Sequence, residues 1–187
     1  MKKLLLLSLL VCLMFSVPAC ALTEQEFKAV CMRGSVQELR EVIKANPNFA
    51  KIRFREMDTP LIIAADKITN PEFLQIIVDT GINLNAQNED GETALMELMD
   101  EPVSLACVNV LLRSGADPNV TDEDGKTALM KALDDDLPSD IISALLDAGA
   151  NAKLRDRKGR SVINYYSRKA YRLQGTEVMK RLEAAAK

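Results

Sequence analysis

Two short acidic segments are the first candidates for chemistry. Asn88-Glu-Asp-Gly91 and Asp122-Glu-Asp-Gly125 contain the carboxylates and the turn glycine of a calcium-binding loop. Aligning Gly125 with the glycine of such a loop places Lys131 where a bidentate glutamate is required, so the ligand set is incomplete. A denser cluster, Asp134-Asp-Asp136, is interpreted as a solvated acidic loop, with weak divalent-cation binding as the alternative. The sequence therefore predicts polar turns at these positions and no metal site.

Catalytic chemistry is restricted by what the chain lacks. None of its 187 residues is histidine, which excludes Ser-His-Asp and Cys-His nucleophiles and metal sites that depend on imidazole. The glycines form neither a Walker loop nor a dinucleotide-binding pattern. Carboxylates are abundant, but their spacing does not favour paired acid–base catalysis. We therefore expect a protein that is not an enzyme and that uses no cofactor.

The amino terminus has the pattern of an export signal. Lys2 and Lys3 precede an apolar run from Leu4 to Val17, which is short for a membrane span. Ala19-Cys-Ala21 supplies the small residues for a cut before Leu22, so residues 1–21 are predicted to be a signal peptide. In the alternative interpretation Cys20 becomes the lipidated first residue of a lipoprotein, although Pro18 fits that motif poorly. The mature chain would be periplasmic or secreted, or else lipid-anchored to a membrane facing the periplasm.

Charge is divided along the chain. The net charge of −3 is the balance of +5 in residues 1–55, −16 in residues 56–150 and +8 in residues 151–187. The acidic middle segment would repel a phosphate backbone, so nucleic-acid binding by the whole chain is disfavoured.

A period of 34 residues organises everything after the signal. One glycine series is Gly91, Gly125 and Gly159, and a second is Gly81, Gly115 and Gly149. A third series, of hydroxyl residues, is Thr59, Thr93, Thr127 and Ser161. Such a period is typical of a solenoid of stacked repeats. We define five units at about 22–53, 54–87, 88–121, 122–155 and 156–187.

Each unit predicts two helices followed by a turn. The Thr or Ser can cap a short first helix, and Pro71, Pro102 and Pro138 mark the turn into a second, more apolar helix. A glycine of the second series ends that helix in a left-handed conformation. Asx- and Gly-rich segments then lead to the next unit. The expected fold class is an all-α repeat solenoid.

The units resemble ankyrin repeats. The resemblance is carried by Thr59-Pro-Leu-Ile-Ile-Ala-Ala65, by Gly115-Ala-Asp-Pro-Asn119 leading to Asp124-Gly-Lys-Thr-Ala-Leu129, and by Gly149-Ala-Asn-Ala leading to Lys158-Gly-Arg-Ser161. It covers about residues 22–187 and implies helix-turn-helix repeats joined by β-hairpin-like loops. The first unit lacks the hairpin segment. The histidine usual after Thr-Pro-Leu is replaced by Ile62, Met96, Met130 and Asn164.

Stacking of such units also bears on the cysteines. Cys31 falls in the first helix of the first unit and Cys107 in the second helix of the third, too far apart for a disulfide. We expect both to pack as small apolar residues.

In ankyrin-repeat proteins the hairpin tips and the exposed side of the first helix line a concave surface, and the resemblance implies which residues form it here. For Tyr165 and its neighbours the alternative is a structural role, in which they close the aliphatic core at the C-terminal end. The implied partner-binding residues are Glu89, Asp90, Glu92, Asp100, Glu101, Glu123, Asp124, Lys126, Asp134, Asp135, Arg157, Lys158, Arg160, Tyr165, Arg168 and Lys169.

These observations together predict an exported, non-catalytic scaffold of a bacterial type, monomeric, that binds a protein partner through a charge-polarised concave face. Two alternatives remain open: a periplasmic inhibitor or immunity protein of a secreted enzyme, and an accessory factor of a periplasmic redox enzyme.

Overall fold

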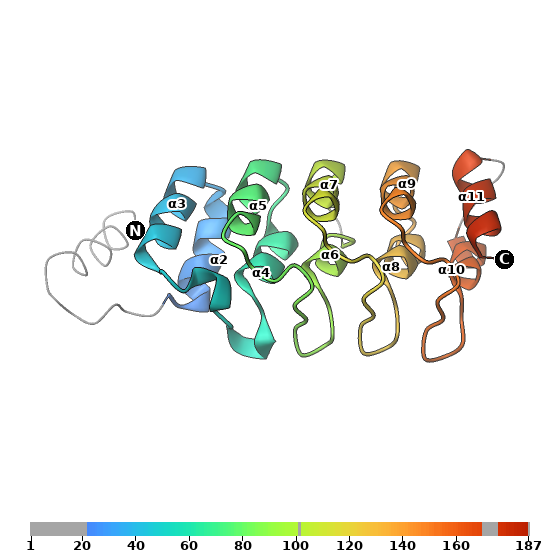
Figure 1. Cartoon of the computed structure of the whole chain (residues 1–187), viewed down its shortest axis with the longest axis horizontal. Helices are drawn as coiled ribbons and strands as arrows, with labels where there is room; N and C mark the ends of the chain where they lie inside the picture. Colours follow the sequence, from blue (N-terminus) through green and yellow to red (C-terminus); the bar gives the residue numbers. More distant parts are fainter. Residues whose placement is uncertain (1–21, 101, 170–175, 187) are drawn as a thin grey trace, which may run out of the picture.

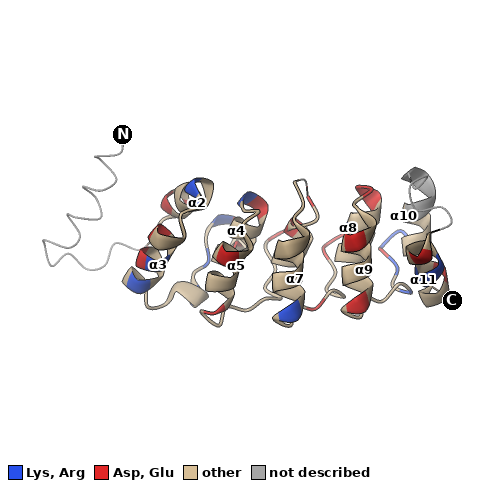
Figure 2. Ribbon diagram, turned by 90° about the horizontal axis from the view of Figure 1, so that it is seen from above, with Lys and Arg blue, Asp and Glu red and all other residues tan. Residues whose placement is uncertain are grey.

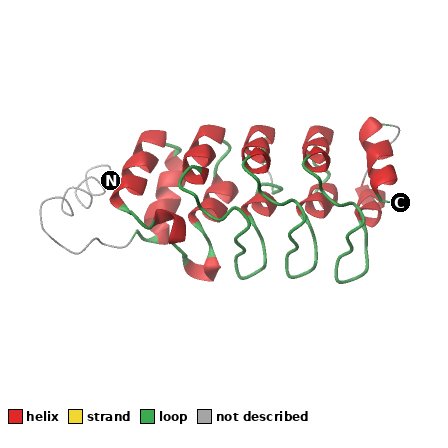
Figure 3. Ribbon diagram, viewed as in Figure 1, coloured by secondary structure: helices red, strands yellow, loops and turns green. Residues whose placement is uncertain are grey.

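The computed structural model describes residues 22–100, 102–169 and 176–186 as a row of helix pairs (Figure 1). Loops project from the row on one side, and the two helices of each pair form two parallel layers (Figures 1 and 3). The first helices are α2 (Glu24–Arg33), α4 (Pro60–Lys67), α6 (Ala94–Glu97), α8 (Ala128–Asp134) and α10 (Val162–Lys169). The second helices are α3 (Val36–Ala45), α5 (Pro71–Val78), α7 (Leu105–Arg113), α9 (Ser139–Asp147) and α11 (Glu177–Ala185).

The helices begin where the sequence places their caps. Thr59, Thr93 and Thr127 are buried, and each hydroxyl accepts a hydrogen bond from the backbone N–H three residues later. Pro71 is the first residue of α5, where the missing N–H costs nothing. Thr176 caps α11 in the same way. The prediction of hydroxyl-capped helices is confirmed for these units.

Glycines end the second helices. Gly81, Gly115 and Gly149 follow α5, α7 and α9 with φ of 76°, 97° and 88°, which is the left-handed region. L residues with a Cβ are disfavoured there, so glycine allows the chain to turn from the helix toward the next hairpin.

One continuous aliphatic core runs through the stack. It contains Ile62, Met96 and Met130, which replace the histidine usual in the family and are at most 2% exposed. The core therefore gains apolar side chains at the position where a polar one is usual. Aromatic side chains close its N-terminal end, where the Phe27 ring lies 5.6 Å from Phe49 and 5.9 Å from Phe54 between centroids.

The first two units differ from the regular pattern. Two short 3₁₀ helices, η1 (Phe49–Lys51) and η2 (Arg55–Met57), stand where later units have open loops (Figure 3). Met57 occupies the repeat position of Gly91, Gly125 and Gly159, yet it keeps a positive φ of 62° and is 51% exposed.

Both cysteines of the described region are buried free thiols, Cys31 in α2 and Cys107 in α7. Burial raises the pKa of Cys31 to about 12. Within residues 22–100, 102–169 and 176–186, no helix combines the length and apolar character required to cross a membrane. The predicted signal peptide, with Cys20, lies outside the described residues.

Candidate functional site

Three projecting hairpins are shaped by the same side-chain contact. Asn88 Oδ1 accepts hydrogen bonds from the N–H groups of Asp90 and Glu92 at 3.1 and 2.8 Å. Asp122 Oδ1 accepts one from Lys126 N at 2.8 Å, and Asp156 Oδ1 accepts from Lys158 and Arg160. Because the Asx side chain satisfies the backbone within the turn, the tip residues are free to point into solvent. Those exposed tips are Glu89, Asp90, Glu123, Asp124, Arg157 and Lys158.

The hairpins also stack on one another. The N–H of Glu123 donates to Asp90 O at 3.0 Å, and the N–H of Arg157 donates to Asp124 O at 2.8 Å. The approach is so close that a Cβ on Gly125 would lie 2.9 Å from Arg157 N. The predicted tips therefore form one continuous row, acidic in the third and fourth units and basic in the fifth.

Behind the acidic tips, a cluster of four charged side chains joins the third unit to the fourth; we call it the inter-unit cluster. It consists of Glu92, Glu97, Asp100 and Lys131. Lys131 Nζ lies 2.5 Å from Glu92 and 3.9 Å from Asp100, and the Lys131 side chain is only 12% exposed. Burial opposes the charge on Lys131, but these carboxylates outweigh it and raise its pKa.

Glu97 is the unusual member of this cluster. Burial, the charge of Glu92 and a hydrogen bond with Glu92 raise the pKa of Glu97 to about 8. Asn88 Nδ2 also donates to Glu97 Oε1 at 3.4 Å. The charged form of Glu97 is therefore disfavoured by burial and by Glu92, while the nearby Lys131 is engaged by Glu92.

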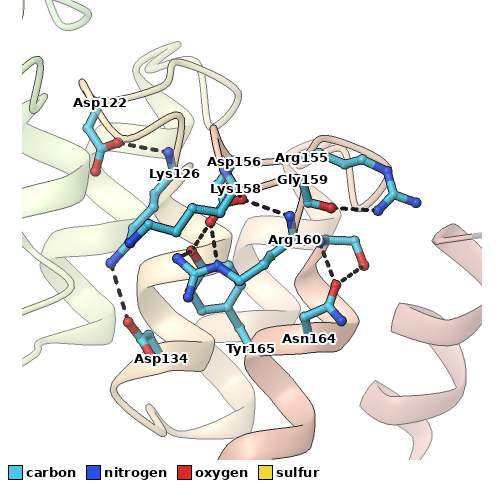
Figure 4. A network of polar contacts seen from close by, with 11 residues as sticks. Asp122, Lys126, Asp134, Arg155, Asp156, Lys158, Gly159, Arg160, Asn164 and Tyr165 are labelled. Atoms are coloured by element: carbon cyan, nitrogen blue, oxygen red, sulfur yellow. Dashed lines mark hydrogen bonds and ion pairs between the residues drawn. The ribbon is translucent and has the colours of Figure 1, made fainter.

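A second cluster lies wholly within the fifth unit; we call it the terminal cluster. Buried Asp156 Oδ2 accepts hydrogen bonds from Arg160 Nε at 2.6 Å and from the Tyr165 hydroxyl at 2.7 Å (Figure 4). Burial opposes ionisation of Asp156, but the hydrogen bonds from Tyr165 and Arg160 lower its pKa to about 2. Arg160 also stacks over the Tyr165 ring, with Cζ 4.7 Å from the centroid.

The fourth unit contacts the terminal cluster through Lys126. Its Nζ lies 5.7 Å from the Tyr165 ring centroid and 3.4 Å from Asp134 Oδ2 (Figure 4). Among the predicted residues, Lys126 and Asp134 of the fourth unit are therefore brought next to Tyr165 of the fifth. Figure 2 shows acidic and basic residues together at the end of α4, acidic residues at the end of α8 and basic residues in the loop at the last helix pair.

Tyr165 is the exception among the predicted surface residues. Its side chain is 1% exposed, so it belongs to the core and was wrongly placed on the partner-binding surface. The physical reason is that Asp156 and Arg160 satisfy its hydroxyl, which allows the ring to close the aliphatic core. Glu101 lies outside the described residues, and so do the side chains of Arg168 and Lys169.

Glu97 was not identified as a site residue in the sequence analysis. Lys131 was considered only because a lysine stands where a calcium loop requires a glutamate ligand. Both occupy one repeat position, which carries Ile63, Glu97, Lys131 and Tyr165 in successive units. Aligning that position across the units would have exposed the succession of an apolar, an acidic, a basic and an aromatic residue. In the described part of the chain, no three Asp, Glu or Cys side chains converge to hold a metal ion.

The family model for ankyrin repeats in three copies matches residues 27–122 and 100–180. The chain therefore belongs to the ankyrin-repeat family, and the predicted fold class is confirmed. A search of curated protein sequences gives no significant match. Ankyrin repeats are generally protein-interaction modules and typically serve as non-catalytic scaffolds.

Proposed function

We propose that this protein is an exported, non-catalytic binding module that meets a protein partner with its hairpin tips and first-helix face. The observation that carries the proposal is the division of charge along one row of hairpins. Glu89, Asp90, Glu123 and Asp124 are exposed on adjacent tips, and exposed Arg157 and Lys158 follow directly on the next tip.

The arrangement of this row is suited to orienting a partner. The tips are held by backbone hydrogen bonds from one unit to the next, so their charges keep a fixed order. A partner with a basic region beside an acidic one would be steered into a single register on this surface. Such steering affects the association rate and the specificity more than the final affinity.

The binding test begins with capture of partners by the tagged protein from the compartment in which it accumulates. The identified partner is then measured against a variant with Arg157→Glu and Lys158→Glu, the two exposed basic tip residues of the fifth unit. The matched control reverses Lys44 and Arg113, which are exposed on second helices and give the same change of net charge. We expect the first variant to lose at least tenfold in affinity at low salt and the control to retain it. Equal losses in the two variants would reject the hairpin row as the binding surface.

Export requires a separate test. The support for it is the basic start, the apolar run from Leu4 to Val17 and the small residues before Leu22. Mass spectrometry of the mature N-terminus distinguishes the outcomes. A free Leu22 supports soluble export, a diacylglyceryl Cys20 supports a lipid anchor, and a retained Met1 contradicts both.

A further inference from the structure

One backbone hydrogen bond joins the hairpins and recurs every 34 residues. The N–H groups of Glu89, Glu123 and Arg157 each donate to a carbonyl of the preceding unit, at 2.8, 3.0 and 2.8 Å. The acceptors have the same spacing and are Glu56, Asp90 and Asp124. The contact is therefore a property of the repeat, in which each unit presents one carbonyl to the hairpin that follows it.

A side chain closes the N-terminal end of this series. The N–H of Arg55 is the preceding donor at the same spacing, and no hairpin of the described residues lies before it. Glu24 Oε2 takes the place of a carbonyl and accepts this hydrogen bond at 3.2 Å. A second copy of the chain that stacked end to end would need the same N–H, so the structure does not favour head-to-tail self-association through the hairpins.

The C-terminal end of the series is open. Lys158 has the next carbonyl at this spacing, and no group of the described residues donates a hydrogen bond to it. A Cβ on the neighbouring Gly159 would meet nothing within 4 Å, whereas a Cβ on Gly125 would lie 2.9 Å from Arg157 N of the next hairpin. The fifth hairpin is the last of the projecting loops in the described part of the chain (Figure 1). We call its outer side, at Lys158 and Gly159, the open edge.

Arg155 adds hydrogen-bond donors to the open edge. Its guanidinium donates to Gly159 O at 2.8 Å, within its own hairpin. Gln87, at the same repeat position, donates both to Gly91 O in its own hairpin and to Thr121 O in the next one, the latter at 2.9 Å. Figure 4 shows the Arg155 guanidinium on the side of the fifth hairpin away from the fourth unit. Because a guanidinium has five N–H donors, Arg155 can make the second contact as well.

The side chains around the open edge are basic. None of the four exposed basic residues of this hairpin forms an ion pair with a described residue; they are Lys153, Arg155, Arg157 and Lys158. The hairpin that packs on the inner side of the fifth one is acidic, with Glu123 and Asp124 at its tip. A segment that packed on the outer side would likewise need acidic side chains to match these charges.

We propose that the open edge binds an acidic turn or hairpin of the partner, which extends the hairpin row by one step. A backbone N–H of that segment donates to Lys158 O, and one of its backbone carbonyls accepts from the Arg155 guanidinium. Its Asp or Glu side chains meet Arg157 and Lys158. Main-chain hydrogen bonds then give the contact its register, and the charges give it specificity. The inference rests on the proposed function and specifies the part of the partner that the row receives.

The test uses a cyclic peptide and the 15N-labelled protein. The probe has the sequence of residues 120–127, joined head to tail, and so carries the acidic tip that the fifth hairpin already accepts on its inner side. The comparison peptide is methylated on the amide nitrogen that corresponds to Glu123, which removes the donor and keeps every charge. Both are titrated at low salt and followed by NMR. We expect the unmethylated probe to shift the signals of Lys158 and Gly159 and to bind at least fivefold more tightly. Equal binding of the two peptides, or no binding of the unmethylated one, would overturn the proposal.

Two glycine variants locate the contact. Gly159→Ala places a Cβ where the backbone of the added segment would lie, and should weaken binding of the probe at least fivefold. The matched control is Gly81→Ala in the second unit, because Gly81 has a φ of 76° against 74° for Gly159 and also meets nothing within 4 Å. The control should change binding less than twofold. Equal weakening by the two variants would show a general effect of backbone strain and would place the probe elsewhere.

Failure of this proposal is distinguishable from failure of the proposed function. If the captured partner depends on Arg157 and Lys158 but binds Gly159→Ala as tightly as wild type, only the contact at the open edge is rejected. If the partner does not respond to reversal of Arg157 and Lys158, the proposed function itself fails, whatever the peptides do.

Discussion

The inter-unit cluster and the terminal cluster share two repeat positions but pair their charged groups differently. One shared position carries Glu92 and Arg160, and the other carries Glu97, Lys131 and Tyr165. In the inter-unit cluster Lys131 reaches back 39 residues to Glu92, so the contact joins two units. In the terminal cluster Asp156, Arg160 and Tyr165 lie within nine residues of one another and close on themselves. An interior unit has a neighbour that supplies the counter-charge. Within the described residues no further hairpin follows that of the fifth unit, and a local buried network takes that role there.

The two clusters also differ in how well their charges are satisfied. Asp156 is a fully bonded carboxylate with a lowered pKa, whereas Glu97 faces another carboxylate and has a raised one. The terminal cluster therefore contributes to stability, while the inter-unit cluster leaves an acidic excess on the first-helix face. We infer that this excess serves binding.

The largest predicted effect concerns the buried carboxylate of the terminal cluster. Asp156→Ala removes the acceptor of the Tyr165 hydroxyl and of Arg160 Nε together with two backbone hydrogen bonds of the turn, and should lower the free energy of unfolding by about 3 kcal/mol. Asp122→Ala, at the same repeat position in the fourth unit, removes one backbone hydrogen bond and should cost about 1 kcal/mol. Urea denaturation followed by circular dichroism measures both. Equal losses would show that the terminal network adds no stability.

The next largest effect compares two hairpin glycines. Gly125 lies against the next hairpin, whereas Gly159 does not. Gly125→Ala would place a Cβ 2.9 Å from Arg157 N at a φ of 79° and should destabilise by about 2 kcal/mol. Gly159→Ala meets nothing within 4 Å at a φ of 74°, so only the backbone strain of about 1 kcal/mol applies. The same denaturation experiment compares them. A larger loss at Gly159 would contradict the described stacking of hairpins.

A third prediction uses pH to distinguish the clusters. Glu97 has a folded pKa of about 8, above its ordinary value of 4.5, so the folded state binds more protons between these values. Stability should therefore fall as pH rises from about 5 to 8, by at most about 1.4 kcal/mol per pH unit and by less because Glu97 is partly solvent-accessible. Glu97→Gln should flatten this slope. An unchanged slope in the variant would place the titrating group elsewhere.

The pH dependence of stability expected from Asp156 has the opposite sign to that expected from Glu97. The pKa of Asp156 is lowered from 3.8 to about 2, so the stability that it contributes is present above pH 4 and lost as pH falls toward 2. Acid denaturation of the wild type and of Asp156→Asn measures this part of the comparison. If both lose stability equally between pH 4 and 2, the terminal cluster is not the acid-sensitive element.

The smallest predicted effect is at Met57. It adopts a positive φ where three later units have glycine, so Met57→Gly relieves backbone strain while increasing the entropy of the unfolded chain. The net gain should be about 0.5 kcal/mol in the free energy of unfolding, again by urea denaturation. A clear loss would show that the Met57 side chain contributes to packing despite its exposure.

The fold could be predicted from the sequence because its signals are local and periodic. Thr59, Thr93 and Thr127 cap helices, Gly81, Gly115 and Gly149 end them, and each acts through its own backbone neighbours. These signals require no knowledge of distant contacts.

The candidate site was harder to predict from the sequence because its chemistry depends on contacts between units. Glu97 looks like an ordinary helical glutamate until Glu92 and Lys131 are placed around it, and Lys131 is 34 residues further along the chain. Tyr165 was misplaced for the same reason, since its burial follows from bonds to Asp156 and Arg160. Charge sign could be predicted from composition, but pairing and burial could not.

The rate of partner association tests the central claim most directly. Stopped-flow mixing of the captured partner with wild type and with the Arg157→Glu, Lys158→Glu variant should show at least a tenfold slower association of the variant at low salt. The difference should shrink as added salt screens the charges. Equal rates at low salt would contradict the claim that the charge-divided hairpin row is the surface that receives the partner.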